Sequence, residues 1–154
     1  MIIKLGDITK CEERILIHQT NCVNKMASGV AKAIFTKWPN VKSEYHGFCE
    51  GTSPNDLIGN VQHVVTSGPV VFNVFSQYNR GRDGKLYTNY TAVKAGFYNV
   101  LAKLDYIFWN EDDNGGNIAL PYLYGCGLGG GEWSVVSNII DEVFGDRAVC
   151  YKFP

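Results

Sequence analysis

The sequence predicts an α/β fold in which helices cover both faces of a mostly parallel β-sheet. Short apolar runs, which are typical of buried strands, alternate along the chain with amphipathic helical stripes. Two β-rich segments, 61–65 and 70–75, are separated only by the turn Ser67-Gly68-Pro69, so they should form an antiparallel pair within a mixed sheet. At 154 residues, of which 45% are hydrophobic, the chain is expected to form one domain spanning 1–154.

The first half of the chain should contain two strands followed by two helices. Ile15-Leu16-Ile17 is a continuous apolar run, which suits a strand covered on both faces. The first helix should begin after Ser28, a residue suited to an N-cap, and should stop at Pro39. In chain order we expect a strand at 2–5, a turn at 6–9, a strand at 14–19, and helical stripes at 30–38 and 41–49.

The second half of the chain should add two helices and two more strands after the antiparallel pair. The longest helical stripe runs from Tyr90 to Leu104, between a Gly/Asn/Arg-rich loop at 77–87 and an acidic loop at 110–117. Beyond it we expect a strand at 118–121, a Gly-rich loop at 124–131, a helix at 136–144 and a last strand at 149–153.

Two of the predicted connections run from a strand through a small-residue loop into a helix, at 20–30 and 124–133. The free N–H groups and the dipole of a helix N-terminus favour an anion at such a place. Two such loops side by side would suit a diphosphate, although ordinary tight connections would have the same composition. Gly125–Gly130 matches G-x-G-x-x-G, but its late position in the chain does not fit a dinucleotide-binding unit.

The bulk composition favours a soluble protein of a reducing compartment. The formal net charge is −1, so no overall attraction to nucleic acid or an anionic membrane is expected. The five cysteines form no C-x-x-C pair, which argues against a disulfide framework and a zinc site. The sequence shows no signal peptide and no membrane-spanning run, so we expect a cytoplasmic protein without a metal.

The order and spacing of several motifs resemble the macrodomain family over nearly the whole chain. The block from Arg14 to His18, leading into Asn21-Cys22 and followed by Lys37-Trp38-Pro39, looks closest to the ADP-ribose 1″-phosphate phosphatase branch. The resemblance implies a three-layer α/β/α macrodomain that binds ADP-ribose or ADP-ribose 1″-phosphate without a cofactor. The motifs that carry it are Gly6-Asp7-Ile8, Asn21-x-x-Asn24, Ser28-Gly29-Val30-Ala31 and Gly125-Cys126-Gly127-Leu128-Gly129-Gly130-Gly131.

The resemblance also implies a set of ligand-binding residues. Asp7 would accept a hydrogen bond from the adenine amino group, and Tyr151 would lie near the adenine ring. The alternatives are a turn residue for Asp7, a core residue for Tyr151, and a loop brace for Asn21. The full expected set is Asp7, Ile8, Asn21, Ser28, Gly29, Val30, Gln77, Cys126, Gly127, Leu128, Gly129, Gly130, Gly131 and Tyr151.

Three residues are candidates for catalysis of phosphomonoester hydrolysis. By resemblance, His18 is a catalytic histidine and Asn24 faces the distal ribose; the alternatives are a core histidine and a loop residue with positive φ. Glu132 stands at a helix start, where it would either activate water or only complement the helix dipole. Backbone N–H groups would stabilise the phosphoryl oxygens.

Other residues separate the rival functions. Gln77 and Gly129 stand where macrodomains with a lysine nucleophile carry a lysine and an aspartate, so covalent lysine catalysis is disfavoured. The basic loop residues Arg80, Arg82 and Lys85 would contact a terminal phosphate or simply be solvated. The alternatives to a phosphatase are a non-catalytic ADP-ribose-binding module and a hydrolase of ADP-ribosylated protein or nucleic acid. A nucleic-acid partner is not expected from the net charge, and the oligomeric state is left open.

Overall fold

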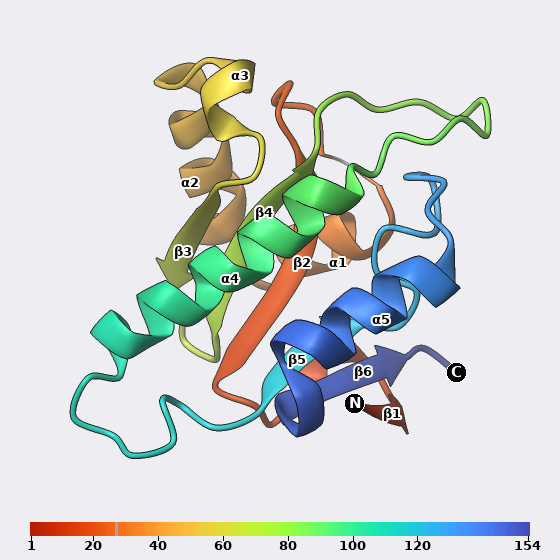
Figure 1. Cartoon of the computed structure of the whole chain (residues 1–154). Helices are drawn as coiled ribbons and strands as arrows, with labels where there is room; N and C mark the ends of the chain where they lie inside the picture. The colour runs from red at the N-terminus through yellow and green to blue at the C-terminus, as the bar shows by residue number, and fades with distance from the viewer. Residues whose placement is uncertain (27) are drawn as a thin grey trace.

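The computed structural model, which describes residues 1–26 and 28–154, contains a six-stranded sheet with helices on both faces (Figure 1). The strand order is β1-β6-β5-β2-β4-β3, and every neighbouring pair is parallel except β3 and β4. The predicted mixed, mostly parallel sheet is therefore confirmed. The strands are β1 (Ile2–Leu5), β2 (Ile15–Asn21), β3 (Val61–Val65), β4 (Val70–Gln77), β5 (Ile118–Pro121) and β6 (Ala148–Lys152).

Two apolar clusters, one on each face of the sheet, make the three layers. One cluster joins the sheet to α4 and α5, and the other joins it to α1, α2 and α3. In Figure 1, α4 and α5 cross in front of the sheet while α1 and α2 lie behind it. The helices are α1 (Gly29–Lys37), α2 (Pro39–Glu50), α3 (Pro54–Leu57), α4 (Tyr90–Ile107) and α5 (Trp133–Val143), with short 3₁₀ turns η1 (Ile8–Lys10) and η2 (Gly145–Arg147).

Strand β2 is buried on both faces because it lies in the middle of the sheet. Ile15 and Ile17 enter the cluster under α4 and α5, whereas Leu16 enters the opposite cluster. The period of two residues along a strand puts His18 on the same face as Leu16. Its imidazole accordingly meets the Phe35 ring of α1 edge-on, with 5.9 Å between ring centroids. His18, the first polar residue after this apolar run, is thus held inside the fold.

Two local predictions were imprecise. Pro39 ends α1 as expected, but it also begins α2 as the first helical residue, because proline needs no N–H at that position. The expected turn at 6–9 overlaps η1, which begins at Ile8, and the Asp7 carboxylate accepts a hydrogen bond of 2.9 Å from the Thr9 N–H as its N-cap. Ser28 does occupy the N-cap position of α1, though its hydroxyl makes no capping bond within the described residues.

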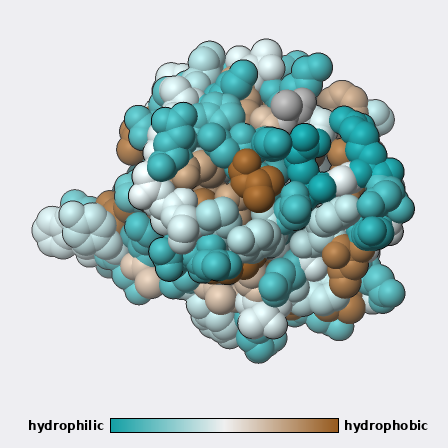
Figure 2. Space-filling model, turned by 90° about the horizontal axis from the view of Figure 1, so that it is seen from above, coloured by the Kyte–Doolittle hydropathy of each residue, from teal (hydrophilic) through white to brown (hydrophobic). Residues whose placement is uncertain are grey.

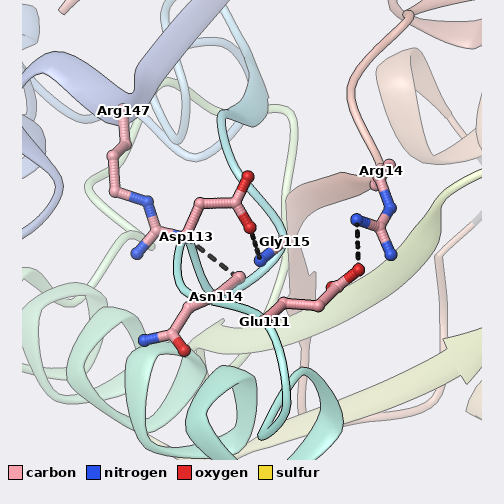
Figure 3. A network of polar contacts seen from close by, with 6 residues as sticks. All are labelled: Arg14, Glu111, Asp113, Asn114, Gly115 and Arg147. Atoms are coloured by element: carbon pink, nitrogen blue, oxygen red, sulfur yellow. Dashed lines mark hydrogen bonds and ion pairs between the residues drawn. The ribbon is translucent and has the colours of Figure 1, made fainter.

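The acidic loop predicted at 110–117 is pinned to the body of the protein at the amino ends of β2 and β5 (Figure 3). Arg14 contacts Glu111, with 3.0 Å between Nη1 and Oε1. Arg147 donates to two loop carbonyls, Asn114 at 3.2 Å and Gly116 at 2.9 Å. This end of the sheet is closed by structural contacts, which leaves the carboxyl ends of the parallel strands as the place for a ligand.

No helix among the described residues combines the length and the apolar character needed to cross a membrane.

Candidate functional site

A cavity of about 640 Å³ opens at the carboxyl ends of β2, β4 and β5. The loops that follow these three strands form its walls. Seen from above, this end of the molecule is mostly hydrophilic, and apolar residues show only as separate patches (Figure 2). The predicted site residues that line the cavity are His18, Asn21, Asn24, Ser28, Gly29, Val30, Gln77, Gly127, Leu128 and Gly129.

The other predicted site residues do not line this cavity. Asp7 and Ile8 lie at η1, and Ile8 shares an apolar cluster with Tyr151 of β6. Tyr151 is 6% exposed and donates a hydrogen bond of 2.5 Å to Glu13. Glu132 is exposed at the N-cap position of α5, where its backbone N–H donates to the Tyr90 hydroxyl at 2.9 Å. The remaining members of this group are Cys126, Gly130 and Gly131, in the same Gly-rich loop as the lining residues.

The first wall, the loop after β2, is folded around the buried carboxamide of Asn21. Its oxygen accepts from the backbone N–H of Val23 at 3.1 Å and of Lys25 at 3.2 Å. The Tyr45 hydroxyl of α2 donates to the same oxygen at 2.9 Å. Asn21 therefore braces the loop, the alternative that the sequence offered for it.

Asn24 occupies the tip of this loop with a left-handed backbone, at φ 62°. Asparagine tolerates this conformation better than other non-glycine residues. Its carboxamide oxygen accepts a hydrogen bond from Nδ1 of His46, which comes from α2 and also lines the cavity. Helix α2 therefore fixes both asparagines of the Asn21-x-x-Asn24 segment, through Tyr45 and His46 respectively.

The second wall is the Gly-rich loop after β5, which packs tightly on the start of α4. The Gly129 carbonyl accepts from the backbone N–H of Tyr87 at 2.8 Å and of Thr88 at 2.9 Å. A Cβ atom at Gly129 would lie 2.4 Å from the Thr88 hydroxyl oxygen and 2.8 Å from the Gly125 carbonyl oxygen. No side chain fits at Gly129, so this loop presents backbone rather than a carboxylate to the cavity.

His18 is among the residues that line the cavity and is 1% exposed. Its Nε2 is 2.6 Å from the Asn73 carboxamide oxygen, and its Nδ1 has no hydrogen-bond partner in residues 1–26 and 28–154. Burial lowers the pKa of His18 to about 4, against a weaker opposing effect of the Asn73 bond. The imidazole is therefore neutral at neutral pH. The buried Thr20 hydroxyl, two residues on along the same face, likewise lacks a partner in the described chain.

The ionisable side chains on the cavity are basic, apart from the histidines and tyrosines. Lys25, Lys42, Arg80 and Arg82 all line it, whereas no aspartate or glutamate does so in the described chain. Lys85, the third basic residue of the loop after β4, instead contacts Asp83 at 3.7 Å. The sequence did single out both arginines, but it left open whether they were merely solvated.

Sequence reasoning missed Lys25, Lys42 and His46 as cavity residues. The only signal for the two α2 residues is their spacing of four positions, which places both on one face of a helix. That face can be assigned to the cavity only when the packing of α2 is known. Lys25 directly follows Asn24, and its proximity to a candidate residue was the one available hint.

The two cysteines of the loops have protonated thiols. Burial raises the pKa of Cys22 to about 12 and that of Cys126 to about 11. Both groups therefore lack the thiolate that a nucleophile requires. In the described residues, no group of three or more His, Cys, Asp or Glu side chains is arranged to hold a metal ion.

The chain matches no protein-family model and no curated protein sequence. Solved structures show the same fold at low sequence identity. A protein of unknown function from Bacteroides thetaiotaomicron superposes with a TM-score of 0.80 at 22% identity, covering 99% of this chain and 97% of that one. The macrodomain of Mycobacterium tuberculosis DarG gives 0.78 at 21% identity, covering 99% and 98%.

Thermosipho africanus DarTG in complex with ADP-ribose gives a TM-score of 0.74 at 18% identity. The match covers 99% of this chain and 42% of the longer one. The three-layer α/β/α fold with a mixed sheet is therefore the macrodomain fold, as the sequence predicted.

Proposed function

We propose that the protein binds ADP-ribose 1″-phosphate and hydrolyses its terminal phosphomonoester to ADP-ribose and phosphate. The observation that carries this proposal is the charge of the cavity: Lys25, Lys42, Arg80 and Arg82 line it, and no carboxylate does in the described residues. A phosphomonoester adds about −1.5 to −2 charges to the diphosphate of ADP-ribose at neutral pH. A cationic rim around a backbone cradle suits a ligand with that additional charge.

The binding mode follows from the two walls. The diphosphate would lie between the start of α1 and the Gly-rich loop, where backbone N–H groups are available. The adenine would extend beyond the cavity toward Asp7 and Tyr151, beside η1, which packs against α1. The macrodomain fold supports this placement, as does the ADP-ribose complex of a protein with the same fold.

Hydrolysis would require a water molecule to attack phosphorus while the bond from phosphorus to the ribose 1″-oxygen breaks. The phosphate keeps the oxygen and one hydrogen of the water molecule, and the ribose 1″-oxygen takes the other hydrogen and leaves as a hydroxyl group. We assign stabilisation of the phosphoryl oxygens to backbone N–H groups, Arg80 and Arg82, and contact with the distal ribose to Asn24. We assign acceptance of a hydrogen bond from water to neutral His18. Glu132 is given no contact with the ligand, because it is exposed and lies off the cavity.

The test is phosphate release from ADP-ribose 1″-phosphate by the purified protein and three variants. Asn24→Ala and His18→Gln should each lower kcat by about 10²-fold or more. Glu132→Gln is the matched control, because it removes a carboxylate next to the Gly-rich loop of the cavity. It should leave the rate of phosphate release unchanged. Phosphate release by the unmodified protein no faster than by His18→Gln would overturn the proposal.

A non-catalytic ADP-ribose-binding module is the second candidate. The position of Glu132 favours it, since no carboxylate of the described chain lines the cavity to act as a general base. Calorimetry separates the two functions: a module binds ADP-ribose tightly and turns over no ADP-ribosyl substrate. A panel of ADP-ribosylated protein and nucleic acid tests the remaining hydrolase alternative. We place either activity in the cytoplasm, in keeping with five cysteines that all remain free thiols.

A further inference from the structure

His18 is the last member of a chain of side-chain hydrogen bonds that crosses three strands and ends on a helix. His18 of β2 lies directly opposite Asn73 of β4, and Asn73 lies directly opposite Gln62 of β3. His18 Nε2 is 2.6 Å from Asn73 Oδ1, and Asn73 Nδ2 is 3.0 Å from Gln62 Oε1. Gln62 Nε2 in turn donates to the backbone carbonyl of Glu44, in α2, at 2.8 Å.

The direction of every bond in this chain follows from the Glu44 carbonyl, at the end opposite His18. A backbone carbonyl can only accept, so the Gln62 atom that faces Glu44 must be the amide nitrogen. The Gln62 oxygen then faces Asn73, so Asn73 must donate a hydrogen bond to it from its own amide nitrogen. The Asn73 oxygen is left facing His18, and it can only accept a hydrogen bond, so Nε2 must carry the hydrogen. A carbonyl in α2 thus determines which imidazole nitrogen in β2 carries the hydrogen.

We infer that Gln62 and Asn73 are positioning residues that hold His18 as the Nε2–H tautomer, so that Nδ1 presents a lone pair to the ligand in the cavity. The tautomer itself depends only on the hydrogen-bond chain. Its use for the ligand rests on the function proposed above, in which His18 accepts a hydrogen bond from water.

The surroundings of His18 agree with this assignment. Nδ1 is buried and has no partner within the described residues, and an unsatisfied buried acceptor is costly unless a water or ligand group completes it. This chain of hydrogen bonds contains two carboxamides and a peptide carbonyl but no carboxylate, so the Asn73 bond stabilises the imidazolium less than burial destabilises it. This agrees with the lowered pKa of His18. The partner at Nε2 therefore selects a tautomer without charging the ring.

The test reads the tautomer directly, by ring-¹⁵N NMR of the histidine-labelled full chain at neutral pH without ligand. His18 should show a protonated Nε2 and an unprotonated Nδ1. Gln62→Met keeps the length of the side chain but removes both of its hydrogen bonds, so Asn73 is free to turn its amide nitrogen toward His18. A second His18 species with protonated Nδ1 should then appear, and kcat for phosphate release should fall severalfold at unchanged KM.

His63→Gln is the matched control, because it changes the next residue of β3, leaves the chain intact and removes one of the other two histidine signals. It should leave the His18 tautomer as it is in the unmodified protein. A protonated Nδ1 in the unmodified protein would overturn the inference, and so would an identical His18 spectrum in Gln62→Met. Absence of turnover with the expected spectrum would count against the phosphatase proposal and leave the tautomer assignment intact.

Discussion

His46 donates a hydrogen bond from Nδ1 to the carboxamide oxygen of Asn24, whose backbone is left-handed at φ 62°. This contact connects α2, a helix of an outer layer, with the tip of the loop after β2. It leaves the amide nitrogen of Asn24 free to donate, and it limits the orientations that the side chain can adopt. Ligand recognition by Asn24 should therefore depend on a residue 22 positions away in the sequence.

His46→Ala should weaken ADP-ribose binding about fivefold, because the loss of one ordering hydrogen bond is worth about 1 kcal/mol. Calorimetry with ADP-ribose measures the effect. Ser43→Ala, on the same helix, is the control: among the described residues its hydroxyl hydrogen-bonds only to the carbonyls of Pro39 and Asn40. Equal affinities for the two variants would mean that the His46 contact has no part in binding.

Gly129→Ala should lower the free energy of unfolding by about 1–3 kcal/mol, since the added methyl group overlaps the Thr88 hydroxyl. Gly127→Ala in the same loop adds its methyl group to open space, with no atom within 4 Å, and should be neutral. Thermal and urea unfolding of the two variants provide the comparison. A Gly129→Ala protein as stable as Gly127→Ala would show that the loop can move away from α4.

Because His18 is buried, the free energy of unfolding should decrease as the pH is lowered from about 6.5 to about 4. The pKa of His18 is about 4 in the folded protein, against an ordinary value of 6.5. In that interval the unfolded chain binds a proton that the folded protein does not, so unfolding is favoured as the pH decreases. The full effect is about 3 kcal/mol, and it levels off below pH 4. Urea unfolding of the unmodified protein and His18→Gln across this range should show a pH-dependent difference, and parallel curves would contradict the prediction.

Arg80→Ala and Arg82→Ala should each weaken binding of ADP-ribose 1″-phosphate about threefold to tenfold, and binding of ADP-ribose less. The reason is the additional phosphate, which should lie closer to this rim than the diphosphate does. Lys85→Ala removes a positive charge from the same loop but at a residue that lies off the cavity and contacts Asp83. If Lys85→Ala had the same effect, general attraction by the loop would explain the data better than direct contact.

Asp7 offers a test that separates binding from stability. Two hydrogen bonds from Thr9 hold the pKa of Asp7 below its ordinary value, so the carboxylate is ionised. Asp7→Asn keeps an oxygen for the N-cap but loses the charge, so its stability should be retained while ADP-ribose binding weakens. Asp7→Ala should also lose about 1 kcal/mol of stability. Unchanged ADP-ribose affinity in both variants would exclude Asp7 from adenine recognition.

The order of strands and helices could be predicted because hydrophobic period and turn residues are local. The run Ile15-Leu16-Ile17 defines the central strand, and Ser67-Gly68-Pro69 defines the one antiparallel turn. The two small-residue loops could be placed at the carboxyl ends of the strands for the same reason, since each follows a buried parallel strand. Pro39 was read only as a stop, because proline is equally suited to ending one helix and beginning the next.

The side chains that meet across elements could not be predicted in the same way. Lys42 and His46 reach the cavity only through the rotation of α2 about its axis, which packing determines. Gln62 and Asn73 align with His18 through strand register, and a shift of one residue would place them on the other face. Glu132 was a candidate from its position at a helix start, but the sequence does not say which way such a side chain points.

The Gly-rich loop is held in its conformation by contacts within the protein. Its carbonyls at Gly125 and Gly129 are occupied by the hydroxyl and backbone of Thr88, at 2.6 Å and 2.9 Å, and a Cβ atom at Gly129 would have no room beside them. The loop should then lose little conformational entropy when a ligand binds. Such a loss weakens binding where a loop must first fold around its ligand. Complex formation should accordingly proceed in one kinetic phase, at a rate that diffusion and ionic strength determine rather than loop closure.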